Sequence, residues 1–140
     1  MNKTDVSFIL LIFLLAACGA PTLPPSPQGD LRLSVDGGEP LTQLDIDFGQ
    51  LPVGQSRELT VVASNLGRDP LLITHTQLEG AQSGVFFLRG VPVALAPGVS
   101  SSFVISFTPS AAMPFEARLS LLHDGFTRVA TAHLQGKGTP

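Results

Sequence analysis

The feature that most constrains the fold of this chain is a period of two in its side chains from residue 31 onward. In residues 102–108, for example, Phe103, Ile105 and Phe107 fall on one face of an extended strand, with smaller side chains between them. Glycine, proline, asparagine or aspartate interrupts the alternation every few residues, and no stretch carries an apolar stripe at helical spacing. Many short strands with such spacing are typical of a β-sandwich or barrel.

Eight segments combine this alternation with flanking turn residues, and we predict that each is a β-strand. They are Leu31–Val35, Leu44–Phe48, Arg57–Asn65, Leu71–Leu78, Val85–Leu88, Ser102–Thr108, Phe115–His123 and Arg128–Gln135. The apolar positions change parity within Leu71–Leu78, which predicts a β-bulge near Thr74 and His75.

The last two segments are predicted to form a hairpin, because Asp124-Gly125 between alternating runs is a two-residue turn signal. A slip of one residue would place Glu116 and Arg118 on the apolar face, so the register is well specified. The predicted cross-strand pairs are Phe115 with Leu134, Ala117 with Ala132, and Leu119 with Ala130.

The first 17 residues are typical of a secretory signal peptide. A short polar start carrying Lys3 precedes an apolar run, Val6–Ala17. Twelve residues of helix would reach about 18 Å, whereas a bilayer core is about 30 Å thick. The run therefore favours a cleaved leader over a spanning helix.

The leader ends in Leu15-Ala16-Ala17-Cys18-Gly19, which resembles the lipobox of bacterial lipoproteins. The resemblance implies a diacylglyceryl group on the Cys18 thiol, cleavage before Cys18, and acylation of the new amine. Two or more acyl chains anchor a protein stably in a bilayer. The expected location is therefore the bacterial cell envelope, and Gly19 in place of an aspartate favours the outer membrane.

Residues 18–30 link this anchor to the domain at 31–140. Ala20–Gly29 contains four prolines in ten residues, a density incompatible with helix or sheet. At about 3.1 Å per residue, such a tether would hold the domain up to roughly 30 Å from the bilayer. A tail with no spacing role is an equally open interpretation.

Charge and cysteine content exclude several functions. The chain has a net charge of −3, only two lysines and no block of like charge, so nucleic-acid binding and a polybasic membrane patch are disfavoured. Its one cysteine is Cys18. The domain therefore has no internal disulfide and depends on its core for stability.

Several short motifs resemble those of the ASH/hydin-like immunoglobulin-like domains, whose bacterial relatives are often labelled choice-of-anchor D proteins. The motifs are Leu44-Asp45-Ile46-Asp47-Phe48-Gly49, Val53-Gly54, Asn65, Gly67, Pro70-Leu71, Leu95-Ala96-Pro97-Gly98, Phe107-Thr108-Pro109 and Leu134-Gln135-Gly136-Lys137-Gly138. The resemblance covers about residues 44–138. It implies an all-β, immunoglobulin-like antiparallel sandwich of seven to eight strands, similar to the major-sperm-protein type. It also implies a docking or scaffold module, because members of the family serve in such roles.

No residue set demands catalysis, a metal or a cofactor. Nucleophilic catalysis needs serine or cysteine beside an oriented histidine, and we expect His75, His123 and His133 to be structural or solvated. His133 is predicted to face outward opposite Glu116. Ser100-Ser101-Ser102 lacks the strand-to-helix elbow of esterases.

Two alternating carboxylates, Asp45 and Asp47, could contribute to a calcium site, although a solvated strand face is the expected role. An apolar stretch offers the best candidate interaction patch, made of Phe86, Phe87, Val91 and Val93, because exposed aromatic side chains favour interfaces. Alternation would bury about half of the consecutive apolar run Val85–Leu88, and burial of both faces at a sandwich edge is the alternative interpretation.

The sequence therefore predicts a non-enzymatic, lipid-anchored module that presents an immunoglobulin-like domain to a protein partner in the cell envelope. One alternative is a chaperone-like or accessory subunit that acts by strand addition, which requires an open sheet edge. A second alternative is a cell-wall or carbohydrate binder. It would have to stack sugars on phenylalanine, since tryptophan and tyrosine are absent.

Overall fold

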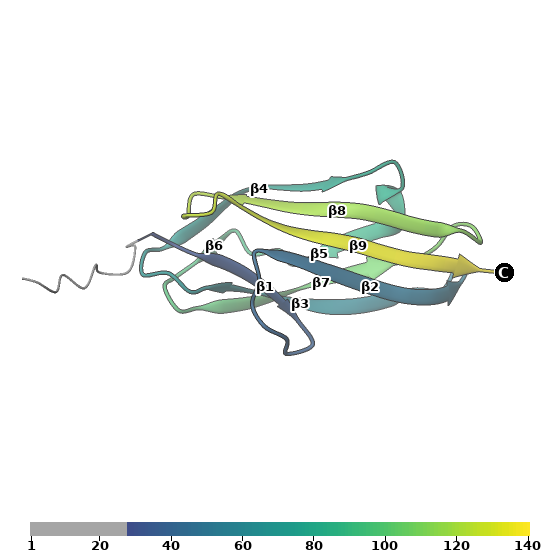
Figure 1. The fold of residues 1–140 in the computed structure, drawn as a ribbon, viewed down its shortest axis with the longest axis horizontal. Coiled ribbons are helices and arrows are strands. Elements are labelled where there is room, and N and C mark those ends of the chain that lie inside the picture. The colour runs from purple at the N-terminus through teal and green to yellow at the C-terminus, as the bar shows by residue number, and fades with distance from the viewer. Residues whose placement is uncertain (1–27) are drawn as a thin grey trace, which may run out of the picture.

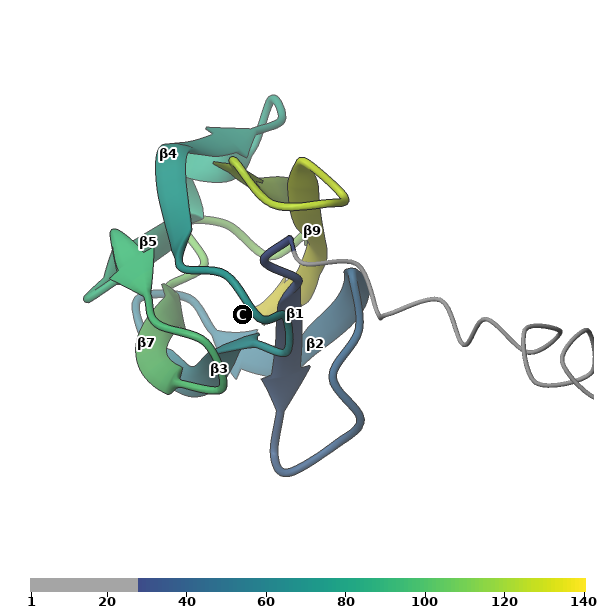
Figure 2. The same ribbon diagram turned by 90° about the vertical axis from the view of Figure 1, so that its left-hand side faces the viewer.

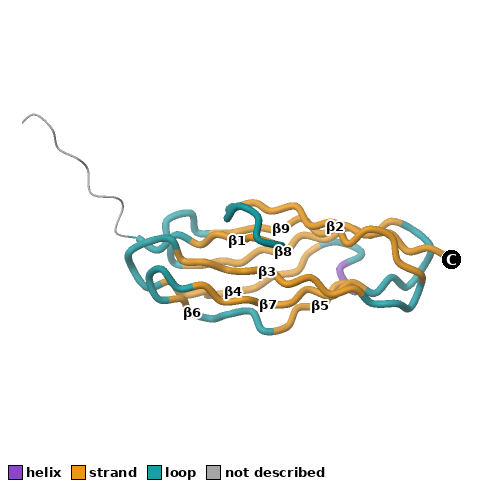
Figure 3. The backbone as a smooth tube through the Cα atoms, turned by 90° about the horizontal axis from the view of Figure 1, so that it is seen from below, coloured by secondary structure: helices purple, strands orange, loops and turns teal. Residues whose placement is uncertain are grey.

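Two β-sheets pack face to face in the computed structural model, which describes residues 28–140 (Figures 1 and 3). One short 3₁₀ turn, η1 (Ser83–Val85), precedes β5. The strands are β1 (Leu31–Val35), β2 (Gln43–Pro52), β3 (Arg57–Asn65), β4 (Leu71–Glu79), β5 (Phe86–Arg89), β6 (Ala94–Leu95), β7 (Ser100–Phe107), β8 (Pro114–His123) and β9 (Val129–Thr139).

The smaller sheet has the order β1-β3-β7-β5, and the larger has the order β2-β9-β8-β4-β6. This arrangement confirms the predicted all-β sandwich. All strand pairs are antiparallel except β2 with β9, which run parallel. In this pair, β2 lies at the edge of the larger sheet beside the last strand of the chain.

Each predicted strand corresponds to an observed one, although several begin or end at other residues, and two further differences stand out. Val85 belongs to η1 instead of β5. The two-residue β6 lies within a segment predicted as a turn, because so short a strand leaves no alternation to detect. The predicted bulge is confirmed, since the register of β4 against β8 shifts between Ile73 and His75.

The β8–β9 hairpin has the predicted core face but a register that differs by two residues. Phe115 pairs with Gly136, and Leu119 pairs with Ala132. The two-residue turn prediction was wrong because the connection is longer, and the His123 amide donates to the Arg128 carbonyl (2.9 Å). Arg128 adopts a left-handed conformation (φ 65°) to close this loop. A shift of two conserves strand parity, so the same side chains stay inside.

Four phenylalanine rings fill the core where β2, β5, β7 and β8 meet. Phe107 stacks on Phe86 with ring centroids 5.1 Å apart, and it lies 5.6 Å from Phe48 and 5.9 Å from Phe115. Aromatic pairs at such distances add to the free energy gained from apolar burial. The rings join strands of both sheets, so the sandwich has one shared core.

The buried amide of Asn65 organises one end of the sandwich. Its Oδ1 accepts hydrogen bonds from the Asp30 and Gly67 amides, at 3.1 and 3.0 Å. Its Nδ2 donates to the carbonyls of Asp69 and Leu95, at 2.8 and 3.0 Å. One side chain thereby joins three separate segments, and its hydrogen-bonding capacity is fully used.

The chain enters this end of the sandwich between two glycines. A Cβ on Gly67 would lie 2.2 Å from the Gln28 carbonyl oxygen, and one on Gly125 would lie 2.4 Å from that of Gly29. Both positions therefore require glycine because of close backbone approach. Three loops surround Gln28–Asp30, namely Leu66–Pro70, Ala96–Val99 and Asp124–Arg128. We call this end of the sandwich the N-terminal pole, and it faces the viewer in Figure 2.

The opposite end, which we call the C-terminal pole, is made of Gly80–Val85, Thr108–Met113 and the end of β9. Backbone hydrogen bonds hold it together, among them Thr108 to Val85 (2.9 Å) and Gly138 to Met113 (2.9 Å). Figure 1 shows the start of β1 near one end of the long axis and the C-terminus at the other. The two poles therefore point in opposite directions.

Candidate interaction surfaces

The predicted interaction patch is divided between the core and the surface. Phe86 belongs to the aromatic core, so it is not part of any surface patch, and Val91 is half-buried against the same core. Phe87 and Val93 are exposed, at 57% and 76%. Strand alternation explains the difference, because Phe86 and Phe87 point to opposite faces of β5.

Phe87 lies in a hollow at the C-terminal pole, with a volume of about 510 Å³. Met113, also exposed, lines the same hollow from the β7–β8 loop, and Val85 lines it from η1. Val93 lies elsewhere, where its carbonyl accepts the Ile73 amide (2.9 Å) near β6. Sequence reasoning missed Met113 because the contact depends on a loop that is distant in the chain.

The sheet edges are protected against strand addition in several ways. On β2, the Asp47 carboxylate accepts the Gly49 amide at a bulge, and Arg57 donates to the Phe48 carbonyl. On β1, Leu33 exchanges two backbone hydrogen bonds with Leu41. The edge strands β5 and β6 have only four and two residues. Charges, bulges and short strands are the usual devices that block edge-to-edge pairing.

The outer face of the larger sheet carries a row of charged side chains instead of an apolar surface. Glu79 pairs with Arg118, Arg118 with His133, and His133 with Asp45 across four strands. The predicted pairing of His133 with Glu116 was wrong because of the two-residue register shift. The His133 Nδ1 lies 3.7 Å from an Asp45 carboxylate oxygen that is largely exposed. The row is a solvated face, as predicted for Asp45.

The calcium alternative for Asp45 and Asp47 receives no support from their surroundings. Asp47 uses one carboxylate oxygen to accept the Gly49 amide (2.7 Å). Within residues 28–140, no three histidine, cysteine, aspartate or glutamate side chains gather closely enough to hold a metal ion.

His123 makes the contact that most resembles a catalytic pair, but its tautomer is unsuited to catalysis. Its Nδ1 accepts a hydrogen bond from the Gly125 amide (3.1 Å), so the neutral ring carries its proton on Nε2. That Nε2 lies 3.3 Å from the Thr127 hydroxyl and can only donate to it. A general base would need a free lone pair there.

Burial lowers the pKa of His123 below its ordinary value of 6.5. The carboxylates of Asp124 and Asp30 oppose this effect, and the Arg128 guanidinium adds to it. The Asp124 carboxylate does not orient the imidazole, because its Oδ1 accepts the Leu72 amide (2.8 Å). His123 is therefore a structural residue of the N-terminal pole.

The other candidate catalytic residues lie apart from His123. His75 is exposed on β4, and His133 faces outward on β9. Ser100 exchanges a hydrogen bond with Ser64 across β7 and β3 (2.8 Å). The structure thus brings no serine and histidine of residues 28–140 together.

The predicted lipobox, Leu15 to Cys18, and most of the proline-rich tether lie outside the described residues. Among residues 28–140, no helix has the length and apolar character required to cross a membrane.

Comparison with known families identifies the class of this domain. The family model ASH (Abnormal spindle-like microcephaly-assoc'd, ASPM-SPD-2-Hydin) matches residues 40–130. The chain therefore belongs to the ASH family, and this membership supports a non-enzymatic interaction or structural module. No curated protein sequence matches the chain.

Solved structures share the fold at low sequence identity. The ASH/PapD-like domain of human CEP192 (PapD-like domain 7) aligns with a TM-score of 0.55 at 13% identity, covering 85% of this chain and 91% of that one. A protein of unknown function from Porphyromonas gingivalis W83 aligns with a TM-score of 0.62 at 18% identity, covering 85% of this chain and 51% of that one.

A protease also contains a similar domain. VesB of Vibrio cholerae aligns with a TM-score of 0.57 at 18% identity, covering 76% of this chain but 32% of the protease chain. This chain therefore spans about half of the Porphyromonas gingivalis protein and about a third of VesB. Likeness at these identities shows a shared fold and nothing about activity.

Proposed function

We propose that this protein is a bacterial lipoprotein, anchored through acyl chains on Cys18, that displays an ASH domain as a docking or structural module in the cell envelope. The outer membrane is the proposed location, because Gly19 follows the cysteine. The observation that carries the proposal is the combination of a lipobox directly after an apolar leader with an ASH domain whose family match begins about twenty residues later, at residue 40.

A non-enzymatic role is supported by the side chains of residues 28–140. The one buried histidine donates to a threonine hydroxyl and cannot accept its proton. Each buried polar side-chain atom of the described residues has a hydrogen-bond partner. Stable folding of the domain is therefore sufficient to explain why these polar side chains are buried. An enzyme of the hydrolase type would need a group poised to react.

The two alternative functions fit the geometry less well. Strand addition needs an open edge, whereas the edges here are short, bulged or charged. A sugar-binding platform needs neighbouring aromatic faces, but Phe87 and Phe126, the two well-exposed phenylalanines of residues 28–140, lie at opposite poles. A protein partner that contacts the Phe87 hollow is therefore the favoured ligand.

The anchor is tested by replacing Cys18 with serine in the full-length protein. Cys18→Ser should move the protein from the membrane fraction to the soluble fraction, because the acyl chains supply the binding energy. Thr22→Ser, a matched change that preserves the lipobox, should leave it in the membrane. Mass spectrometry of the wild-type N-terminal peptide should show the acyl groups on Cys18. Membrane retention of Cys18→Ser would contradict the proposal.

The docking role is tested by affinity capture of the tagged lipoprotein from cross-linked native membranes, with Cys18→Ser as the control. One abundant partner that is lost in the control would support an accessory role in an envelope complex. Recovery of no partner above background would count against docking and favour a purely structural role.

A further inference from the structure

Several large apolar side chains are exposed at or beside the N-terminal pole. Leu66 and Phe126 are 58% and 65% exposed, and Leu72 and Val129 are also exposed. Scattered exposed apolar side chains are ordinary, but a group of them at one place usually marks a contact surface.

Hydrogen bonds to the start of the domain bring these side chains together. The Leu66 amide donates to the Asp30 carbonyl (2.9 Å), and the Phe126 amide donates to the Gly29 carbonyl (2.8 Å). Leu66 and Phe126 therefore flank the place where the chain enters the fold. Leu72 adjoins them, because its amide donates to the Asp124 carboxylate in the same loop as Phe126.

The position of this surface relative to Cys18 limits what can cover it. Nine residues (27 − 18 = 9) separate Cys18 from Gln28, the first described residue. Ten fully extended peptide units span at most about 33–36 Å. If Cys18 is lipidated, the bilayer surface is thus always within that distance of Gln28, and Leu66 and Phe126 flank the residues that follow Gln28.

We propose that the N-terminal pole lies against the lipid bilayer, with Leu66 and Phe126 in contact with its interfacial region. This inference rests on the lipid anchoring proposed above. A tether of this length keeps the membrane at a high effective concentration, so a weak apolar contact is sufficient. The C-terminal pole, with Phe87 and Met113, then faces away from the membrane.

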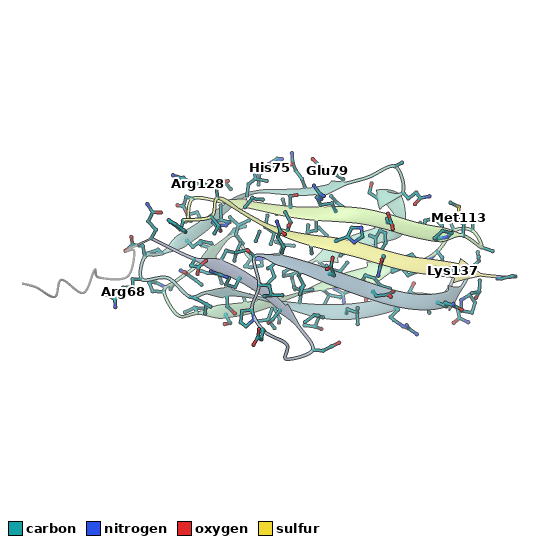
Figure 4. All side chains as sticks on the ribbon, viewed as in Figure 1. Arg68, His75, Glu79, Met113, Arg128 and Lys137 are labelled. Carbon is teal, nitrogen blue, oxygen red and sulfur yellow. The ribbon has the colours of Figure 1, made fainter. Side chains whose placement is uncertain are left out.

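Charges at this pole favour an apolar contact over an electrostatic one. Arg68 and Arg128 are exposed here, at the end opposite Met113 and Lys137 (Figure 4). Two carboxylates, Asp69 and Asp124, are exposed beside them, so the local charge is balanced. A surface of this kind suits phosphate headgroups through arginine and the acyl boundary through phenylalanine and leucine. The contact should therefore persist when anionic lipid is omitted.

Quenching of a fluorophore by spin-labelled lipid tests the orientation. The lipidated full-length protein is reconstituted into vesicles of phosphatidylethanolamine and phosphatidylglycerol, with Phe126→Cys or Met113→Cys as the one free thiol for labelling. The label at residue 126 should lose roughly half of its emission, because a surface seated in the interface lies within about 5–10 Å of the acyl boundary. The label at residue 113 should be unaffected.

A second labelling site tests whether quenching reports the position of the protein surface or only the behaviour of the label at residue 126. A label on Leu66→Cys should be quenched equally well, and Phe126→Ser in the same chain should reduce that quenching. Co-flotation with the vesicles reports the anchor independently of quenching.

Each contrary outcome has its own meaning. Loss of co-flotation would overturn both the anchor and the orientation. Co-flotation without quenching at residue 126, or equal quenching at residue 113, would overturn the orientation alone. A photo-crosslinker at residue 126 that captures a protein instead of lipid in native membranes would also overturn it.

Discussion

His123 links the stability of the domain to pH at the scale of one residue. The ring is buried and accepts the Gly125 amide through Nδ1, which only the neutral form can do. Protonation would break this bond and place a charge in a desolvated site. The lowered pKa of His123 expresses this preference for the neutral ring.

We expect the free energy of unfolding to fall as the pH is lowered from 7.5 to 5.5. The unfolded chain binds a proton near pH 6.5 whereas folded His123 binds it at a lower pH. Between these values the unfolded state holds more protons, and stability rises with pH. Urea titrations followed by circular dichroism should show this slope, and His123→Gln should flatten it. His75→Gln, which replaces an exposed histidine, should leave the slope unchanged. An unchanged slope in His123→Gln would assign the effect to another group.

Single residues also show where sequence reasoning reached its limit. The family resemblance includes Asn65, but the role of this side chain depends on partners at Asp30, Asp69 and Leu95, which only the fold brings together. Similarly, alternation predicts that one of Phe86 and Phe87 is buried but not which one. That choice is fixed by pairing with β7, where Phe86 faces Phe107.

At the scale of elements, β9 makes room for the aromatic core at one position without a side chain. Gly136 faces inward opposite Phe115, and a Cβ there would lie 2.5 Å from the Phe107 ring. Phe107 is fully buried among three other rings and cannot move aside freely. The glycine therefore allows the two sheets to approach.

Replacing Gly136 with alanine should lower the free energy of unfolding by about 1–3 kcal/mol, the usual cost of overpacking a dense core. Gly84→Ala is the matched control, because a Cβ there meets no atom within 4 Å. It should change stability by no more than about 0.5 kcal/mol. Urea unfolding measured by circular dichroism compares the two variants with the wild type. Equal stability of both variants would mean that the rings rearrange readily.

The elements were predictable wherever the hydrophobic pattern was long. Strands β1 and β3 begin and end at the predicted residues because turn residues flank clear alternation. The hairpin register was not predictable from Asp124-Gly125 alone. The His123 ring stabilises a longer loop at that site by accepting the Gly125 amide, and the Gly29 carbonyl, from outside the hairpin, accepts the Phe126 amide.

At the scale of the whole molecule, the sandwich separates two surfaces along its long axis. The apolar side chains around Gln28–Asp30 lie at one end, and the Phe87 hollow lies at the other. Sequence position does not reveal this separation, since the loops of each pole come from distant parts of the chain. A protein anchored at its N-terminus would use the first surface toward the membrane and the second toward a partner.

Two matched substitutions distinguish these roles. Phe87→Ser should reduce capture of a cross-linked envelope partner by roughly tenfold, because truncating an aromatic side chain at an interface costs on the order of 1–2 kcal/mol. Phe126→Ser removes a side chain of the same type and similar exposure from the opposite pole, and it should leave capture unchanged. Both variants should remain in the membrane fraction, since Cys18 is intact. The reverse pattern, with capture lost only in Phe126→Ser, would place the partner at the N-terminal pole. The bilayer could not then occupy that surface, and the orientation proposed for the whole molecule would have to be inverted.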